Sequence, residues 1–231
     1  MVYYGYSLET KVIAVRFFPP SWRDLRYVLW LPLYLLAFLL LERMSGRAWQ
    51  TLQLPLDDWI PFCEWFVIPY CLWYPMLMGT GLWLWLRHPE AFRRYMRFLS
   101  AAFLLGELIW LLLPSIQNLR PAVMPRDNPL TALVAGLYRI DTPTNVFPSV
   151  HVMGAVGAAL AVRDGAGRHG GLSRAAGGLA VLICLSTVFI KQHTLADAAG
   201  GLALSLLVGL PVYRRALFPR PLRGGEAYHS A

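Results

Sequence analysis

Two short segments of this chain carry histidines and an aspartate at spacings that permit nucleophilic chemistry. His151 follows closely on Pro148 and Ser149, and His193 precedes Asp197 by four residues. Residues four apart lie on one face of a helix, so the Asp197 carboxylate can keep one imidazole nitrogen of His193 protonated and leave the other free to attack. The two segments therefore predict a nucleophile with an orienting acid, and a second histidine that carries a proton.

Groups suited to binding an anion flank both histidines. A proline followed by a serine is typical of a helix start, where the free backbone N–H groups of Ser149 and Val150 favour an anion. Arg120 and Lys191 add positive charge, which neutralises phosphoryl oxygens. Taken with the histidines, these groups are those of a phosphoryl-transfer site.

Each of these features also has a purely structural explanation, such as a capped helix, an interfacial histidine or an arginine at a helix end. Asp197 argues for function, because an ionisable residue about one turn into a membrane helix is costly unless it is paired. A metal site built from His151, His193, Asp197 and Asp141 is a competing interpretation. It lacks a recognisable ligand motif, and we expect neither a metal nor another cofactor.

The elements that must position these residues are membrane helices. Of the 231 residues, 57% are hydrophobic and only 15% are charged, and the mean hydropathy is +0.47. Those values argue against an ordinary soluble protein. Three cysteines, all in apolar runs, exclude a disulfide scaffold. The net charge of +8 is compatible with nucleic acid or an anionic membrane surface, and the hydropathy favours the membrane.

The apolar runs predict an all-α integral membrane protein with six transmembrane helices in one bundle. The predicted spans are Tyr27–Leu41, a kinked span within Trp59–Leu86, Phe98–Leu113, Ser149–Val162, Ala175–Ile190 and Leu195–Val212. Asn128–Ile140, between the third and fourth spans, begins with a cap and a proline and predicts a short helix at the outer interface. The catalytic domain is expected over 27–213, between an N-terminal segment (1–26) and a tail (214–231).

The basic residues predict the orientation of the bundle. Six spans place both termini on one side, together with fifteen of the 21 basic residues. The opposite side receives Arg43, Arg47, Arg120, Arg126, Arg139 and Lys191. The positive-inside rule then makes both termini cytoplasmic and the histidine site extracytoplasmic, in a plasma membrane that we expect to be a bacterial inner membrane.

Small residues are concentrated in the last three predicted spans, where they let helix backbones approach closely. These residues are Gly154, Gly157, Ala158, Gly177, Gly178, Ala198, Ala199, Gly200 and Gly201. We therefore expect the last three spans to form the tight functional core. The first three, rich in leucine and aromatic residues, are expected to face more lipid.

The histidine segments resemble the second and third motifs of the type 2 phosphatidic acid phosphatase superfamily, also called lipid phosphate phosphatases. That family's pattern is K-x-x-x-x-x-x-R-P, then P-S-x-H, then S-R-x-x-x-x-x-H-x-x-x-D. The matching segments are Arg120-Pro121, Pro148–His151 and Ser186–Asp197. Leu113 and Thr187 stand where the family has a lysine and an arginine. The Lys-Gln-His sequence at 191–193 is more similar to the branch that includes inositol phosphorylceramide and sphingomyelin synthases and their bacterial relatives.

The resemblance implies that His193 attacks phosphorus, that Asp197 orients it, and that His151 protonates the leaving oxygen and then activates the second substrate. Arg120, Lys191, Ser149 and Val150 would hold the phosphoryl oxygens. The substrate would be a lipid phosphate taken from the bilayer, with no nucleic-acid partner.

Three hypotheses follow from these observations. The first is hydrolysis of a lipid phosphate ester or diphosphate, and the second is transfer of the phosphate or phospho-headgroup to a lipid or polyol. The third is a non-catalytic or transport protein of the same fold, in which intramembrane acids such as Glu64 and Glu107 mark an ion path.

Overall fold

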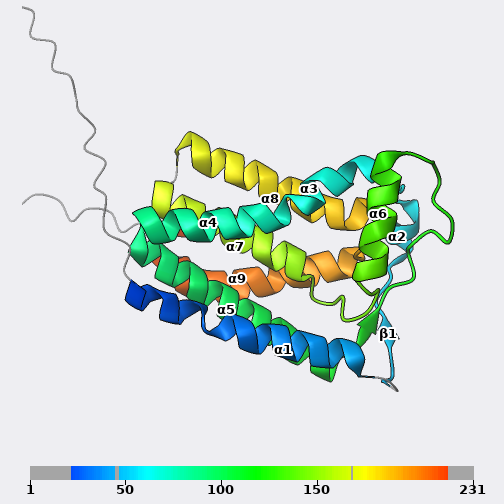
Figure 1. The fold of residues 1–231 in the computed structure, drawn as a ribbon, viewed down its shortest axis with the longest axis horizontal. Coiled ribbons are helices and arrows are strands. Elements are labelled where there is room, and N and C mark those ends of the chain that lie inside the picture. The colour runs from blue at the N-terminus through cyan, green and yellow to red at the C-terminus, as the bar shows by residue number, and fades with distance from the viewer. Residues whose placement is uncertain (1–21, 45–46, 168, 218–231) are drawn as a thin grey trace, which may run out of the picture.

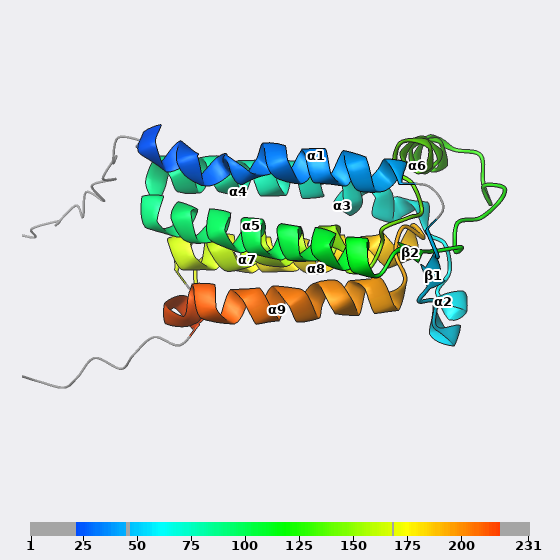
Figure 2. The same ribbon diagram turned by 90° about the horizontal axis from the view of Figure 1, so that it is seen from below.

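The computed structural model describes residues 22–44, 47–167 and 169–217. Long helices run side by side, and α6 lies across one end of their bundle (Figures 1 and 2). The elements are, in chain order, the 3-10 helix η1 (Trp22–Val28), α1 (Trp30–Arg43), β1 (Gln50–Thr51), α2 (Pro55–Trp59), the 3-10 helix η2 (Glu64–Phe66), α3 (Val67–Cys71), α4 (Trp73–Arg87), α5 (Pro89–Leu112), β2 (Ser115–Ile116), α6 (Pro129–Ile140), α7 (Val150–Ala166), α8 (Gly171–Phe189) and α9 (Leu195–Leu217).

Four helical segments are long and apolar enough to cross a membrane: Trp22–Arg43, Pro89–Leu112, Gly171–Phe189 and Leu195–Arg214. The other two predicted spans correspond to shorter helices. α7 has 17 residues, and the second span is divided into α3 and α4 at Leu72, whose backbone stays in the right-handed helical region. The helical membrane architecture is therefore present, and the six-span count stays a prediction.

α7 occupies the middle of the bundle and packs against α4, α5, α8 and α9. Its glycines make this possible. A Cβ on Gly154 would lie 2.6 Å from the Trp73 ring, and one on Gly157 would lie 2.2 Å from the Phe98 ring. The expected close approach is thus confirmed for α7, but it is wrong for Gly177 and Gly178 on α8, where a Cβ would meet nothing within 4 Å.

The division into an inner second half and an outer first half is also wrong in part. α5, from the first half, contributes Tyr95, Phe98 and Ala102 to the centre of the core, all fully buried. α8 instead exposes a leucine-rich face that includes Leu172, Leu182 and Leu185. In a membrane protein a lipid-facing side chain is as apolar as a buried one, so hydropathy does not separate the two.

Helix ends explain several boundaries. Asn128 caps α6 by accepting from the backbone N–H groups of Leu130 and Thr131, and Pro129 takes the first turn, so the predicted short helix forms. α5 begins at Pro89 rather than near Phe98, because the arginines of its first turns are satisfied by ion pairs.

Both ends of the described chain, η1 and the end of α9, lie at the end of the bundle opposite α6 (Figures 1 and 2). This end, which we call the arginine end, carries Arg23, Arg26, Arg87, Arg93, Arg94, Arg97, Arg163, Arg174 and Arg214. The predicted sorting of basic residues between two ends is therefore reproduced for the described residues. Arg215 belongs to the last turn of α9 at the same end, whereas Lys11, Arg16, Arg168, Arg220 and Arg223 lie outside the described residues.

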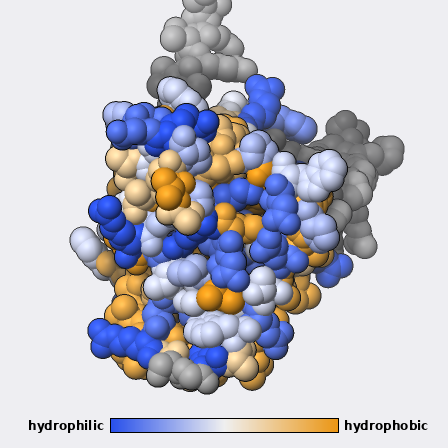
Figure 3. Space-filling model, turned by 90° about the vertical axis from the view of Figure 1, so that its right-hand side faces the viewer, coloured by the Kyte–Doolittle hydropathy of each residue, from blue (hydrophilic) through white to orange (hydrophobic). Residues whose placement is uncertain are grey.

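The opposite end, called the histidine end below, holds α2, α6 and the loops between them. Figure 3 views this end and shows hydrophilic residues gathered over much of its face. The two-residue strands β1 and β2 pair in parallel here, and Ile116 also bridges to Thr144. These pairings, which the sequence did not predict, tie the loops after α1 and α5 to the loop before α7.

The limits predicted for the catalytic domain and the two terminal segments stay a prediction. Residues 22–26 belong to η1, which packs on α5, and α9 continues through 214–217. The remainder of both segments, 1–21 and 218–231, lies outside the described residues.

Candidate active site

The structure brings His151, His193 and Asp197 together at the histidine end. His193 Nε2 lies 3.4 Å from His151 Nδ1, and His193 Nδ1 lies 3.6 Å from Asp197 Oδ2. Each histidine is only 6% exposed, and Asp197 is fully buried. His193 thus has one ring nitrogen facing a carboxylate and the other facing a second imidazole.

Asp197 has a structural role as well. Its Oδ2 accepts the Thr194 backbone N–H at 2.7 Å, and its own N–H donates to Thr194 Oγ1 at 3.1 Å. This reciprocal pair is a capping box that starts α9. The 3.6 Å separation from His193 is longer than a hydrogen bond, and Asp197 Oδ1 is buried without a partner among the described residues.

The His151 ring is held between two aromatic side chains. Tyr70 of α3 stacks on it with centroids 4.5 Å apart, and Trp73 of α4 lies against it at 4.7 Å. His151 Nε2 is buried and has no hydrogen-bond partner in the described part of the chain. The orientation of His151 is therefore set by packing, and Nδ1 is the nitrogen that faces His193.

The start of α7 lies against the start of α9. Ser149 Oγ caps α7 by accepting from Val152 N–H, and the Ser149 N–H donates to Asp197 O at 3.0 Å. The prediction that the Ser149 N–H is free for a phosphoryl oxygen is therefore wrong, because α9 already uses it. The Val150 N–H has no partner within the described ranges, and the Ser149 hydroxyl proton is also free to donate.

Arg120 is fixed by the loop that follows α6. Its guanidinium donates to Tyr138 O, Asp141 O and Thr142 O and to Gln192 Oε1, and it stacks over the Tyr138 ring at 4.6 Å. Burial lowers the pKa of Arg120, an effect that Asp141 opposes. Arg120 Nε is buried with no partner among the described residues, so this donor remains for a ligand.

The Lys191 ammonium, expected to bind phosphoryl oxygens, donates to a backbone carbonyl of α2. Its Nζ donates to the carbonyl of Asp57 in α2 at 2.8 Å, and burial lowers its pKa against the opposing charges of Asp57 and Asp58. The Asp57 carboxylate in turn accepts the N–H of Leu195, the first residue of α9, at 2.7 Å. α2 therefore pins the Lys191–Leu195 loop that carries His193. An ammonium has three donors, so Lys191 keeps two for another acceptor.

Sequence reasoning missed Asp141 as a member of the phosphoryl-transfer site and weighed it only as a metal ligand. Its Oδ2 accepts from Tyr70 OH and Gln192 Nε2, both at 3.4 Å. Burial raises the pKa of Asp141, while the nearby charges of His193 and Arg120 oppose that shift. A second carboxylate thus lies within electrostatic range of His193. It contacts Tyr70 directly and is linked to Arg120 through the side-chain amide of Gln192. The place of this glutamine directly before His193 is the one sequence feature that could have pointed to Asp141.

The metal-site and ion-path interpretations have less support in the described residues. Within 22–44, 47–167 and 169–217, no group of three or more His, Cys, Asp or Glu side chains is arranged to hold a metal ion. Glu64 is tied to the start of α6 by Arg126 and Asn128, and Arg126 lowers the pKa of Glu64 to about 2. That contact is structural. Glu107 is buried in α5, and its Oε1 has no partner among the described residues.

Comparisons with known proteins agree with the motifs. No curated protein and no solved structure gives a significant match to this chain. The family model of the PAP2 superfamily matches residues 36–210, a range that begins within α1, ends within α9 and contains Arg120 and both histidine segments. The chain belongs to the PAP2 superfamily.

Proposed function

We propose that this protein hydrolyses a lipid phosphate ester or diphosphate through a phosphohistidine on His193. Membership of the PAP2 superfamily supports phosphatase-type activity in a membrane protein. The observation that carries the assignment to His193 is its position between Asp197 and His151, at 3.6 and 3.4 Å, in a buried site. One neighbour favours protonation of Nδ1, and the other can exchange a proton with the substrate.

In the first step the His193 Nε2 lone pair attacks phosphorus, and the bond from phosphorus to the leaving oxygen breaks. His151, as the imidazolium, gives its Nδ1 proton to that oxygen. Asp197 stabilises the positive charge that develops on the His193 ring. In the second step His151 takes a proton from water, the hydroxide oxygen bonds to phosphorus, and the nitrogen–phosphorus bond breaks. Phosphate leaves and His193 returns to its neutral form.

The 3.4 Å between the two imidazoles constrains this pathway. In an in-line displacement the leaving oxygen lies on the far side of phosphorus from the attacking nitrogen. A phosphoryl group therefore cannot sit between the rings at their present separation. Substrate binding must move His151 and His193 apart, and the aromatic clamp of Tyr70 and Trp73 is the part that must yield.

Four groups would hold the phosphoryl oxygens. The Val150 N–H and the Ser149 hydroxyl lie at the start of α7, next to His151. Arg120 offers Nε, and Lys191 offers the two ammonium protons that Asp57 does not use. We infer that Lys191 partly replaces the two cations that the family pattern places at Leu113 and Thr187.

The membrane placement is part of the proposal. Six spans arise if α3 and α4 together form one span and α7 forms another. α7 has 17 residues, near the lower limit of the about 17 to 25 helical residues that cross a bilayer. α6, which lies across the end of the bundle, would then rest at the interface. The surplus of arginines at the other end makes that end cytoplasmic, in a bacterial inner membrane, and turns the histidines outward.

Transfer to a lipid or polyol acceptor is the second candidate, and Asp141 is the observation that favours it. Hydrolysis by two histidines and one aspartate leaves no task for another carboxylate, the half-buried Asp141, near His193. Between Tyr70 and Gln192, Asp141 is placed to accept a hydrogen bond from an acceptor hydroxyl. Phosphorus would then pass from His193 to that hydroxyl.

The test is a lipid-phosphate panel assayed on purified protein, with free phosphate and transferred phosphorus both measured. Replacing His193 by Ala should abolish turnover, whereas His169→Ala, which changes an exposed histidine at the arginine end, should leave it unchanged. Full turnover in the His193→Ala variant would contradict both enzymatic proposals, because each assigns the nucleophile to His193. Absence of turnover of every lipid by the wild-type protein would instead favour a non-catalytic or transport role.

The acceptor decides between the two enzymatic proposals. Each active lipid is offered with and without a diacylglycerol, a ceramide or a polyol. Free phosphate as the sole product excludes transfer. A phosphorylated acceptor formed in preference to free phosphate excludes a dedicated phosphatase.

A further inference from the structure

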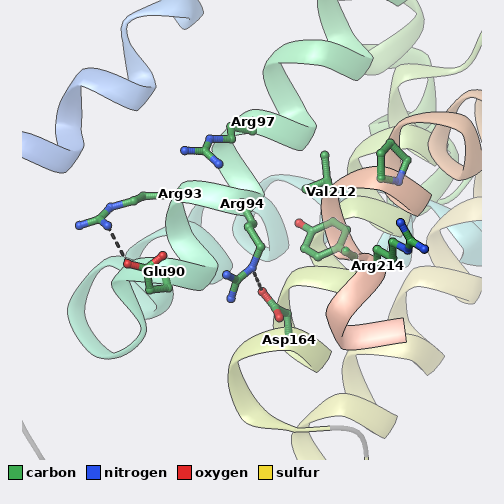
Figure 4. Close-up of a pocket in the computed structure, with 9 residues that line it drawn as sticks. Glu90, Arg93, Arg94, Arg97, Asp164, Val212 and Arg214 are labelled. Atoms are coloured by element: carbon green, nitrogen blue, oxygen red, sulfur yellow. Dashed lines mark hydrogen bonds and ion pairs between the residues drawn. The ribbon is translucent and has the colours of Figure 1, made fainter. Parts of the chain in front are cut away.

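A cavity of about 490 Å³ opens at the arginine end, between the first turns of α5 and the last turns of α9. Figure 4 shows its labelled lining, with Arg94 and Arg97 on one helix and Arg214 on the other. This cavity is at the opposite end of the bundle from the histidines, and the proposed reaction makes no use of it.

The cavity carries an excess of positive charge. Arg93 is neutralised by Asp24 and Glu90, with nitrogen–oxygen distances of 2.8 and 2.7 Å. Arg94 pairs with Asp164 at 2.6 Å.

Arg97 and Arg214 have no carboxylate partner among the described residues. Within the described part of the chain, the Arg97 guanidinium contacts the hydroxyl and ring of Tyr27, and Arg214 is exposed. Two guanidinium groups from different helices therefore border one cavity without a counter-ion.

A buried polar atom provides an independent indication of a ligand. Tyr213 lines the cavity and is 1% exposed, yet its hydroxyl has no hydrogen-bond partner within the described ranges. The hydroxyl is within electrostatic range of Arg94 and Asp164. Pro211 and the non-helical backbone of Tyr213, with φ −106° and ψ 15°, turn the last part of α9 here. An unsatisfied buried hydroxyl is costly, and a bound acceptor would remove that cost.

We propose that this cavity binds a phosphate group carried by an anionic phospholipid. Its two non-bridging oxygens can each accept more than one hydrogen bond, and the cavity is lined by donors that have no carboxylate partner among the described residues, namely Arg97, Arg214 and the Tyr213 hydroxyl. The cavity lies at the ends of two helices long and apolar enough to cross a membrane, which is the level of lipid headgroups. Bound there, the lipid would join α5 to α9. Free phosphate shares this chemistry, and the experiment separates the two sources.

The experiment measures binding to the full-length chain in detergent, in a His193→Ala background so that no probe is turned over. The probes are a short-chain phosphatidylglycerol, a phosphatidylcholine with the same acyl chains, and inorganic phosphate. Phosphatidylglycerol should raise the melting temperature and bind with a measurable dissociation constant, whereas phosphatidylcholine should bind much more weakly. Equal binding of both lipids would overturn the proposal, because phosphatidylcholine carries the same phosphate diester and acyl chains but no net negative charge. Binding of inorganic phosphate alone would keep the phosphate site but overturn its assignment to lipid.

Variants connect the binding to this cavity. Arg97→Gln combined with Arg214→Gln should weaken phosphatidylglycerol binding about tenfold or more, because each removes a charged donor. Tyr213→Phe should weaken binding severalfold without lowering the melting temperature of the free protein, since it deletes only an unpartnered hydroxyl. The matched control is Arg174→Gln, an exposed arginine at the same end but outside the cavity. An equal loss in Arg174→Gln would show general attraction to basic charge and contradict the proposal.

Discussion

The two ends of the bundle use polar residues in different ways. At the histidine end, buried groups are fixed by bonds to distant loops, as in Asp57 to Leu195 and Gln117 to the Lys191 carbonyl. At the arginine end, α5 makes ion pairs in which the arginines are about one-third exposed. The first arrangement fixes atomic positions, whereas the second keeps charge near the surface. Equivalent changes at the two ends should therefore have unequal effects on activity.

The largest effect is expected from removing the charge of Asp197 while keeping its shape. Asn can still accept the Thr194 N–H and start α9, so we expect Asp197→Asn to change the melting temperature little. It should lower kcat on the order of 10³-fold, because the His193 imidazolium loses its stabilising carboxylate. Phosphate release and thermal unfolding are measured on the same samples. A large loss of stability with normal activity per folded molecule would show that Asp197 acts only as the cap of α9.

Gly201→Ala tests whether the contact between α7 and α9 sets the geometry. A Cβ there would lie 2.7 Å from the Ser149 carbonyl oxygen, which is backbone and cannot rotate away. The start of α9 must then move away from Ser149, and His193 with it. We expect a loss of about 1 to 3 kcal/mol in stability and a larger fractional loss of activity.

The matched change is Gly178→Ala on α8, where a Cβ meets nothing within 4 Å. It should be neutral in both assays. Equal activity in the two alanine variants would show that this contact does not position the histidines.

Asp57→Ala tests the bonds from α2 to the site. It removes the acceptor of the Leu195 and Leu54 N–H groups, so we expect about 1 to 2 kcal/mol of destabilisation and a moderate fall in kcat. Asp58→Ala, which changes the exposed neighbour that accepts only from Gln53, is the control and should stay near wild type. Similar values for both variants would argue against α2 as a support of the His193 loop.

The smallest effect is expected at the Glu64–Arg126 pair, which ties η2 to the start of α6. Arg126 lowers the pKa of Glu64 from 4.5 to about 2. The charged form is therefore favoured in the folded protein, and its contribution is present above the ordinary glutamate pKa and lost as pH falls through about 2. Glu64→Gln should unfold slightly more easily than wild type at neutral pH, and the difference should vanish in acid. A difference that persists at low pH would mean that packing, and not charge, holds this contact.

Local spacing was enough to predict several helix ends and the proximity of His151, His193 and Asp197. The interval from His193 to Asp197, and the serine before His151, are properties of a single turn, so the chain itself contains them. Pro129 and Asn128 likewise marked the start of α6. At the α5 start, ion pairs with distant residues allow charged turns to continue the helix. α8, which begins at Gly171, and α9, which continues to Leu217, also extend beyond their predicted spans.

Long-range contacts account for what the sequence did not reveal. Asp57 of α2 accepts from Leu195, which is 138 residues away in the sequence, and Tyr70 contacts both His151 and Asp141. Hydrophobic periodicity in a sequence does not identify contacts between residues that are far apart along the chain. The hydrogen bond from the Lys191 ammonium was not predicted for the same reason, because its acceptor is a backbone carbonyl in α2. Nor could hydropathy place α8 outside and α5 inside, since lipid and core are equally apolar.

The most direct test of the account is to isolate the covalent intermediate. A 4-nitrophenyl phosphate ester needs no proton on its leaving group, so His151→Ala should still form phosphohistidine from it but be slow to release it. Rapid quenching with labelled substrate should then give acid-labile, base-stable label on His193, and none in the double variant with His193→Ala. Label on another residue, or product formed at the same rate without His193, would contradict the central claim.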